Sequence, residues 1–219
     1  MTKEEVCSRI EHIGIVPAIR VSSSEEAHFA ASAVNRAGIP IAEITATVPG
    51  AVEVITRLVK DCPKMVLGAG TVLDVDLAKQ CLDAGAHFLT SPCLVLEIVD
   101  FAVKQGVAVL PGALTPTEVL TAWKAGGDFV KVYPCAPVGA DSYIRALKAP
   151  FPQVKLIAAG GITQQTALHY LLAGASALGV GTALIPREAL RMRREEQIHE
   201  LARRFKKMVK KAQNPESSP

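Results

Sequence analysis

The chain has 219 residues, of which 49% are hydrophobic and 21% are charged. That length supports one sizeable core, so we expect a single α/β domain over residues 1–212 and a disordered tail over 213–219. The net charge of +3 is local, because residues 187–219 carry ten Lys or Arg against five Glu and leave the rest of the chain at −2. We interpret this basic segment, expected as one helix over 187–211, as a solvated face rather than a nucleic-acid or membrane surface.

Cysteine and histidine usage excludes several classes of protein. The five Cys are an odd number without a C-x-x-C pair, which fits neither a disulfide framework nor a zinc ribbon. The five His are scattered and suggest no metal site. The first residues are charged and polar, so we expect no signal peptide and no membrane span. These features predict a cytoplasmic protein without a metal or membrane partner.

Apolar, β-branched runs recur along the chain, and their first residues are 20 to 26 positions apart. They predict eight strands, at residues 15–21, 41–46, 65–71, 88–92, 108–113, 129–134, 155–161 and 177–184. Amphipathic stretches between the strands predict helices at residues 25–36, 51–61, 74–83, 97–104, 116–124, 141–148 and 164–172. Helix start signals agree with this assignment, such as Asp74 at the start of the third helix and Pro116 at the first position of the fifth.

Strand and helix alternating eight times predict a TIM (β/α)8 barrel, and the near-continuous apolar strands fit burial on both faces. An extra N-terminal helix over residues 3–12 is expected to close the bottom of this barrel. The runner-up fold is an open doubly wound sheet. That fold would normally carry G-x-G-x-x-G after its first strand, where this chain has Val21-Ser22-Ser23-Ser24. A barrel would assemble its active site from the C-terminal ends of the strands.

Lys131 is the most informative residue, because it stands alone in the apolar run Phe129-Val130-Lys131-Val132-Tyr133-Pro134. A Lys is almost never fully buried without a partner. Desolvation favours the neutral amine, which can attack a ketone carbonyl and form an imine. The alternative is an edge-strand Lys whose ammonium reaches solvent along its alkyl stem.

Glu43 is the corresponding acid, within Ile41-Ala42-Glu43-Ile44. A buried carboxylate is costly unless a partner or a function retains it. If Glu43 and Lys131 both project into the barrel mouth, Glu43 can act as general acid and base beside a nucleophilic Lys131. The alternative is a structural salt bridge from Glu43 to Lys131 or to Arg20.

Other strand ends predict the substrate-binding groups. Arg20 has a planar guanidinium suited to a carboxylate, and Thr71 adds a hydroxyl at the mouth. Gly160-Gly161 and Gly181-Thr182 follow strands seven and eight, where barrels commonly bind phosphate, although tight packing is the alternative explanation. Pro92 is a turn residue first and a pocket wall second.

These motifs together resemble the 2-keto-3-deoxy-6-phosphogluconate (KDPG) / 4-hydroxy-2-oxoglutarate (KHG) aldolases over about residues 10–187. The motifs that carry the resemblance are Glu43-Ile44-Thr45, Gly68-Ala69-Gly70-Thr71-Val72-Leu73, Ser91-Pro92, Pro111-Gly112, Lys131-Val132-Tyr133-Pro134, Gly160-Gly161-Ile162 and Gly181-Thr182.

The resemblance implies a role for each matching residue. In that family the lysine matching Lys131 forms the Schiff base and the glutamate matching Glu43 handles the protons. The threonine matching Thr71 and an arginine assist the substrate carboxylate, and the glycines matching Gly160, Gly161 and Gly181 line the phosphate end. The family is also typically homotrimeric and uses no metal or other cofactor.

Two positions depart from the family pattern. Many members have an arginine where this chain has Thr47, while others carry it on the first strand, as Arg20 does here. Many members also have a threonine where this chain has Ala159, which removes a hydroxyl from the phosphate side.

We therefore expect the protein to be a metal-independent class I aldolase that cleaves KDPG to pyruvate and glyceraldehyde 3-phosphate. The same chemistry on 4-hydroxy-2-oxoglutarate, 2-keto-3-deoxygluconate or the galactose-series phosphate is the alternative. A phosphate-binding isomerase or epimerase would require paired acids or a metal-binding His set at the strand ends, and the sequence shows neither. A non-catalytic trimeric scaffold is a further alternative.

Overall fold

The structure is a computed structural model that describes residues 1–214. Its strands are β1 (Ile15–Ile19), β2 (Ile41–Thr45), β3 (Val66–Gly70), β4 (Phe88–Thr90), β5 (Ala108–Leu110), β6 (Gly112–Ala113), β7 (Val130–Val132), β8 (Leu156–Ala159) and β9 (Ala175–Val180). Its α-helices are α1 (Lys3–Ile13), α2 (Ser24–Arg36), α3 (Ala51–Asp61), α4 (Val75–Asp83), α5 (Leu96–Gln105), α6 (Pro116–Lys124), α7 (Ala140–Lys148), α8 (Gln164–Leu172), α9 (Arg187–Arg191) and α10 (Glu195–Gln213). A short 3-10 helix, η1, spans Ala136–Val138.

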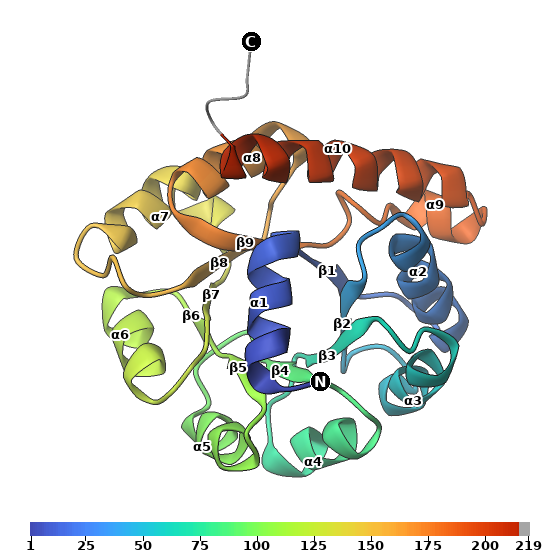
Figure 1. Ribbon diagram of the computed structural model, residues 1–219, viewed down its shortest axis with the longest axis horizontal. Coiled ribbons are helices and arrows are strands. Elements are labelled where there is room, and N and C mark those ends of the chain that lie inside the picture. Colours follow the sequence, from blue (N-terminus) through green and yellow to red (C-terminus); the bar gives the residue numbers. More distant parts are fainter. Residues whose placement is uncertain (215–219) are drawn as a thin grey trace.

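The strands form one parallel sheet in the order β5-β4-β3-β2-β1-β9-β8-β7-β6. Its two ends, β5 and β6, are parts of one barrel strand separated only by Pro111. Proline lacks a backbone N–H, so it interrupts the hydrogen-bonded ladder at that residue. The sheet therefore curls into the predicted (β/α)8 barrel, with the helices around its outside (Figure 1), and the open doubly wound sheet is wrong.

The predicted start signals cap the helices. The Asp74 side chain accepts a hydrogen bond of 2.7 Å from the backbone N–H of Leu77 at the start of α4. Thr115 and Glu118 form a reciprocal capping box at the start of α6, with Pro116 at its first position. Such caps satisfy backbone donors that a helix N-terminus leaves unpaired.

Two boundaries near the C-terminus differ from the predictions. The last strand ends at Val180 instead of reaching 184, because the chain turns there and both Leu184 and Ile185 donate backbone hydrogen bonds to the Gly181 carbonyl. The predicted single helix over 187–211 is broken into α9 and α10 by Arg193, whose φ of 51° is left-handed.

The break in the C-terminal helix turns α10 along α8 at the edge of the barrel (Figure 1). The Arg193 guanidinium lies 4.8 Å from the centre of the Phe29 ring on α2 and so holds the break against the barrel. Residues 215–219, which include most of the expected tail, lie outside the described part of the chain. Within residues 1–214, no helix is long and apolar enough to cross a membrane.

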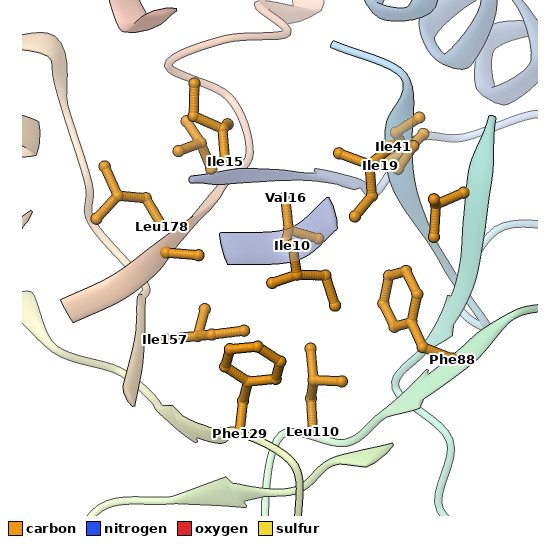
Figure 2. Packing of buried hydrophobic residues seen from close by; sticks show 14 of the residues in the cluster. Ile10, Ile15, Val16, Ile19, Ile41, Phe88, Leu110, Phe129, Ile157 and Leu178 are labelled. Carbon is orange, nitrogen blue, oxygen red and sulfur yellow. The ribbon is translucent and has the colours of Figure 1, made fainter. Parts of the chain in front are cut away.

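The hydrophobic core fills the end of the barrel where the strands begin. Helix α1 crosses this end (Figure 1), and its Ile10 side chain extends into the space between Val16 and the rings of Phe88 and Phe129 in the view of Figure 2. Ile10, Phe88 and Phe129 are fully buried. Because α1 and these side chains close the bottom, polar groups have room only at the opposite end, where the strands finish.

Candidate active site

The Lys131 ammonium and the Glu43 carboxylate meet inside the barrel mouth. Lys131 Nζ lies 3.2 Å from each of the two Glu43 carboxylate oxygens. The two side chains are only 12% and 4% exposed. Glu43 is on β2 and Lys131 on β7, four barrel strands apart in either direction, so the pair spans the barrel. The structure thus brings together the two expected groups and pairs Glu43 with Lys131 rather than with Arg20.

Strand alternation explains why both charged side chains point inward. Val130 and Val132 flank Lys131 and are fully buried, which fits side chains directed at the surrounding helices. Glu43 also needs space inside the barrel, and Gly70 on the adjacent strand β3 provides it. A Cβ built on Gly70 would overlap Glu43 Oε1 and lie 2.5 Å from Glu43 Cδ.

We expect Gly70→Ala to lower kcat/KM by about 10²-fold, because the added methyl displaces the Glu43 carboxylate from Lys131. Gly70 is outside the left-handed region, so alanine is compatible with its backbone. Gly68→Ala is the matched control, since its added methyl would overlap the Phe88 ring and leave Glu43 in place. Both variants should lose about 1–3 kcal/mol of stability from overpacking, measured by denaturant unfolding. Equal kcat/KM values for the two variants would contradict the assigned role of Gly70.

A cavity of about 240 Å³ opens beside the Lys131–Glu43 pair. Of the predicted site residues, its walls contain Arg20, Glu43, Lys131, Gly160, Gly161, Gly181 and Thr182. Thr71 and Pro92 do not line this cavity. Pro92 instead packs against Gly112, the register partner of Lys131, so its contact with a substrate remains a prediction.

Arg20 is held at the mouth by two threonines. Its Nη1 donates to Thr47 Oγ1 at 3.4 Å and its Nη2 donates to Thr71 Oγ1 at 3.2 Å. Thr71 is in the left-handed region with a φ of 57°, which is strained for a β-branched residue and places its hydroxyl beside Arg20. Arg20 makes no ion pair within residues 1–214, so its guanidinium is available to an anion.

The paired glycines form a second polar wall. Gly160 and Gly161 have φ values of 85° and 87°, which L side chains rarely adopt. A Cβ on Gly161 would also overlap Ala136, so packing and backbone conformation both require glycine there. In the described part of the chain, the backbone N–H groups of Gly161 and Thr182 donate to no protein acceptor. Two free N–H groups at the edge of one cavity are suited to a phosphate.

The sequence did not indicate Tyr133 and Arg187 as site residues, although both line the cavity. The Tyr133 ring centre lies 6.0 Å from Lys131 Nζ, at the strand end where a wall residue could have been expected. Arg187 lines the cavity as the first residue of α9. The sequence alone places Arg187 in the solvated basic segment. Its position at the mouth depends on the early end of β9 and on the turn that follows, and the sequence pattern indicated neither.

Comparison with known proteins gives one consistent result. The family model described as KDPG and KHG aldolase matches residues 6–201. A 2-dehydro-3-deoxy-phosphogluconate aldolase from Treponema pallidum (strain Nichols) is 32% identical over 162 residues, which cover 74% of this chain and 77% of the relative. A 2-dehydro-3-deoxy-6-phosphogalactonate aldolase from Escherichia coli (strain K12) is 31% identical over 172 residues, which cover 78% and 83%.

A solved structure agrees with these relatives. The crystal structure of KDPG aldolase from Legionella pneumophila, described with pyruvate captured at low pH as a covalent carbinolamine intermediate, has a TM-score of 0.83 and 28% sequence identity. The match covers 90% of this chain and 96% of that chain. The residues that the family model matches, 6–201, contain every strand of the barrel, including β2 with Glu43 and β7 with Lys131.

Proposed function

The chain belongs to the KDPG and KHG aldolase family, and from this premise we propose that it is a class I aldolase acting through a Schiff base on Lys131. Membership makes it an aldolase, a carbon–carbon lyase. The observation that carries the proposed mechanism is the buried contact of 3.2 Å between Lys131 Nζ and both oxygens of Glu43. That contact places a proton acceptor directly on the amine that must lose a proton before it attacks.

The proposed reaction begins when Glu43 takes a proton from Lys131 and the free amine attacks C2 of a 2-keto acid. Glu43 returns this proton to the carbinolamine hydroxyl, which leaves as water, so that an iminium forms and Glu43 is again a carboxylate. Glu43, directly or through a water, then removes the proton of the C4 hydroxyl, the C3–C4 bond breaks, and its electrons form an enamine while an aldehyde leaves. Protonation at C3 and hydrolysis release pyruvate and regenerate Lys131. No step requires a metal or another cofactor.

We propose that Arg20 binds the substrate carboxylate. Its guanidinium reaches Thr47, the position where many members of the family carry an arginine. Arg20, at the end of β1, therefore brings a positive charge to the place that this arginine would occupy after β2. Thr71 orients this guanidinium through the contact at 3.2 Å. The carboxylate next to C2 would then lie between Arg20 and Lys131, which both line the cavity.

We propose that the far end of the substrate is a phosphate held by the N–H groups after β8 and β9, which makes KDPG the preferred substrate. Ala159 supplies no hydroxyl there. Support for a phosphorylated substrate also comes from the names of the relatives, which act on phosphorylated gluconate and galactonate derivatives. The galactose-series phosphate, unphosphorylated 2-keto-3-deoxygluconate and 4-hydroxy-2-oxoglutarate are the alternative substrates.

The expected result is a kcat/KM for KDPG about a hundredfold above that for 2-keto-3-deoxygluconate, since several charge-assisted hydrogen bonds to phosphate retain about 3 kcal/mol after desolvation. The measurement follows pyruvate release from KDPG, its galactose-series isomer, 2-keto-3-deoxygluconate and 4-hydroxy-2-oxoglutarate. Equal values for KDPG and 2-keto-3-deoxygluconate would show that the glycine turns serve packing alone. A higher value for the galactose-series phosphate would move the assignment to that substrate.

The homotrimer is a further prediction, and the non-catalytic scaffold is a further alternative; each has its own test. The homotrimer implied by the family resemblance is tested by light scattering of the purified protein. The non-catalytic scaffold is tested by the same pyruvate assay, since a scaffold would release no pyruvate from any of the four acids. The isomerase or epimerase is disfavoured by the site itself, because Glu43 is the only acid among the residues that line the described cavity.

A further inference from the structure

A second cavity adjoins the active site and is unusually rich in arginine. It has a volume of about 470 Å³ and shares Arg20, Val21 and Arg187 with the catalytic cavity. Arg191 lines only this outer cavity. Arg20 and Arg187 therefore lie at the boundary between the two cavities. Arg187 is the charged residue of α9 that lines the catalytic cavity.

The acids near this cluster are already engaged. Glu26 also lines the outer cavity, but its Oε2 accepts hydrogen bonds from the Ser22 backbone N–H at 3.2 Å and from the Ser22 hydroxyl at 2.8 Å. Glu188, next to Arg187 on α9, pairs with Arg194 at 3.3 Å. Within residues 1–214, neither Arg187 nor Arg191 has an acidic partner.

The position of Arg187 is fixed by apolar anchors on both sides. Leu184 and Ile185 before it are buried in the turn closed by Gly181, and Leu190 after it is 3% exposed. Arg187 and Arg191 are also four residues apart on a short helix, where like charges repel and destabilise the helix. A bound anion would relieve this repulsion, which gives the arrangement a physical reason.

Resting on the function proposed above, we propose that Arg187 is a specificity-determining residue that binds the terminal phosphate of the substrate. Gly161 and Thr182 line the same cavity as Arg187 and present uncharged backbone N–H donors. Arg187 adds a guanidinium, whose fork matches two phosphate oxygens at once. It thereby adds a positive charge beside these uncharged donors and offsets the missing hydroxyl at Ala159.

Arg187→Gln tests this assignment, with Arg191→Gln as the matched control on the same helix. The quantity compared is the ratio of kcat/KM for KDPG to kcat/KM for 2-keto-3-deoxygluconate. We expect Arg187→Gln to lower the ratio about tenfold, the effect of losing one partly solvated charge-assisted contact. Arg191→Gln should lower it less than about twofold, because an exposed charge beyond the catalytic cavity contributes little. Arg187→Lys should recover part of the ratio, since it keeps the charge and loses the fork.

Inorganic phosphate provides a second readout that does not depend on turnover of KDPG. As an inhibitor of 2-keto-3-deoxygluconate cleavage, it should have an inhibition constant about tenfold higher in Arg187→Gln than in the wild type, and nearly unchanged in Arg191→Gln. An unchanged ratio in Arg187→Gln, with a wild type that prefers KDPG, would overturn the role of Arg187 and leave the proposed function standing. An equal fall of this ratio in Arg187→Gln and Arg191→Gln would assign the effect to the general positive charge of α9, and it would also overturn the role of Arg187. A wild type without preference for KDPG would overturn both the phosphate assignment and this inference.

Discussion

Lys131→Ala is expected to abolish cleavage, with kcat/KM falling by about 10⁴-fold or more, because Lys131 is the only lysine among the residues that line the described cavity and so supplies the amine for the covalent intermediate. Lys131 is the side chain that contacts Glu43 inside the barrel, and it is 12% exposed. The assay is pyruvate release from KDPG. Circular dichroism should show an intact barrel, since the strand keeps its buried neighbours Val130 and Val132.

The matched control for this prediction is Lys131→Arg. Removing the cation altogether leaves the Glu43 side chain, which is 4% exposed, as a buried carboxylate without its partner, and that costs stability. Arginine retains a cation beside Glu43 but cannot form an imine with a ketone. Loss of cleavage in both variants, with the fold retained in Lys131→Arg, assigns the loss to chemistry. Cleavage at the wild-type rate in either variant would remove Lys131 from the mechanism.

Glu43→Gln is expected to lower kcat by roughly 10² to 10⁴-fold, the usual effect of removing a general acid–base group. The amide keeps the size of the side chain and can still accept a hydrogen bond from Lys131, but it cannot carry the proton of the C4 hydroxyl. The measurement separates the two stages of the reaction, by comparing the rate of imine formation with pyruvate and the rate of cleavage of KDPG. Cleavage should suffer more than imine formation.

A Glu43→Gln variant with wild-type turnover would make Glu43 a structural partner of Lys131 and nothing more. Glu43→Asp adds a finer control. It retains the carboxylate but shortens the side chain, so the contact of 3.2 Å to Lys131 Nζ lengthens. Intermediate activity in Glu43→Asp is expected if the position of the carboxylate matters as well as its charge.

The barrel and the pairing of Glu43 with Lys131 could be predicted from the sequence because both follow from burial. Charged residues inside apolar strands are costly, and the C-terminal ends of barrel strands converge, so Lys131 and Glu43 could be expected to meet. The structure shows this contact between Lys131 and Glu43 across the barrel. The distance itself could not be predicted, since it depends on the space that Gly70 leaves on the neighbouring strand.

The details that escaped prediction arise from tertiary contacts. Arg187 was not recognised as a site residue, because it belongs to a basic segment whose pattern predicted one solvated helix. Only the turn closed by the Gly181 carbonyl, together with the break at Arg193, brings α9 to the barrel mouth. The association of Arg20 with Thr47 and Thr71 joins three strand ends far apart in sequence, so no local pattern indicated it.

The most direct test of the account is chemical trapping of the imine. Borohydride reduction of the protein with pyruvate, followed by peptide mass spectrometry, should attach one pyruvate-derived group at Lys131 and at no other lysine, because only a Schiff base is reduced to a stable link. Lys131→Arg should acquire no such group under the same conditions. A trapped group at a different lysine, or no trapped group in the wild type, would contradict the proposed Schiff-base mechanism.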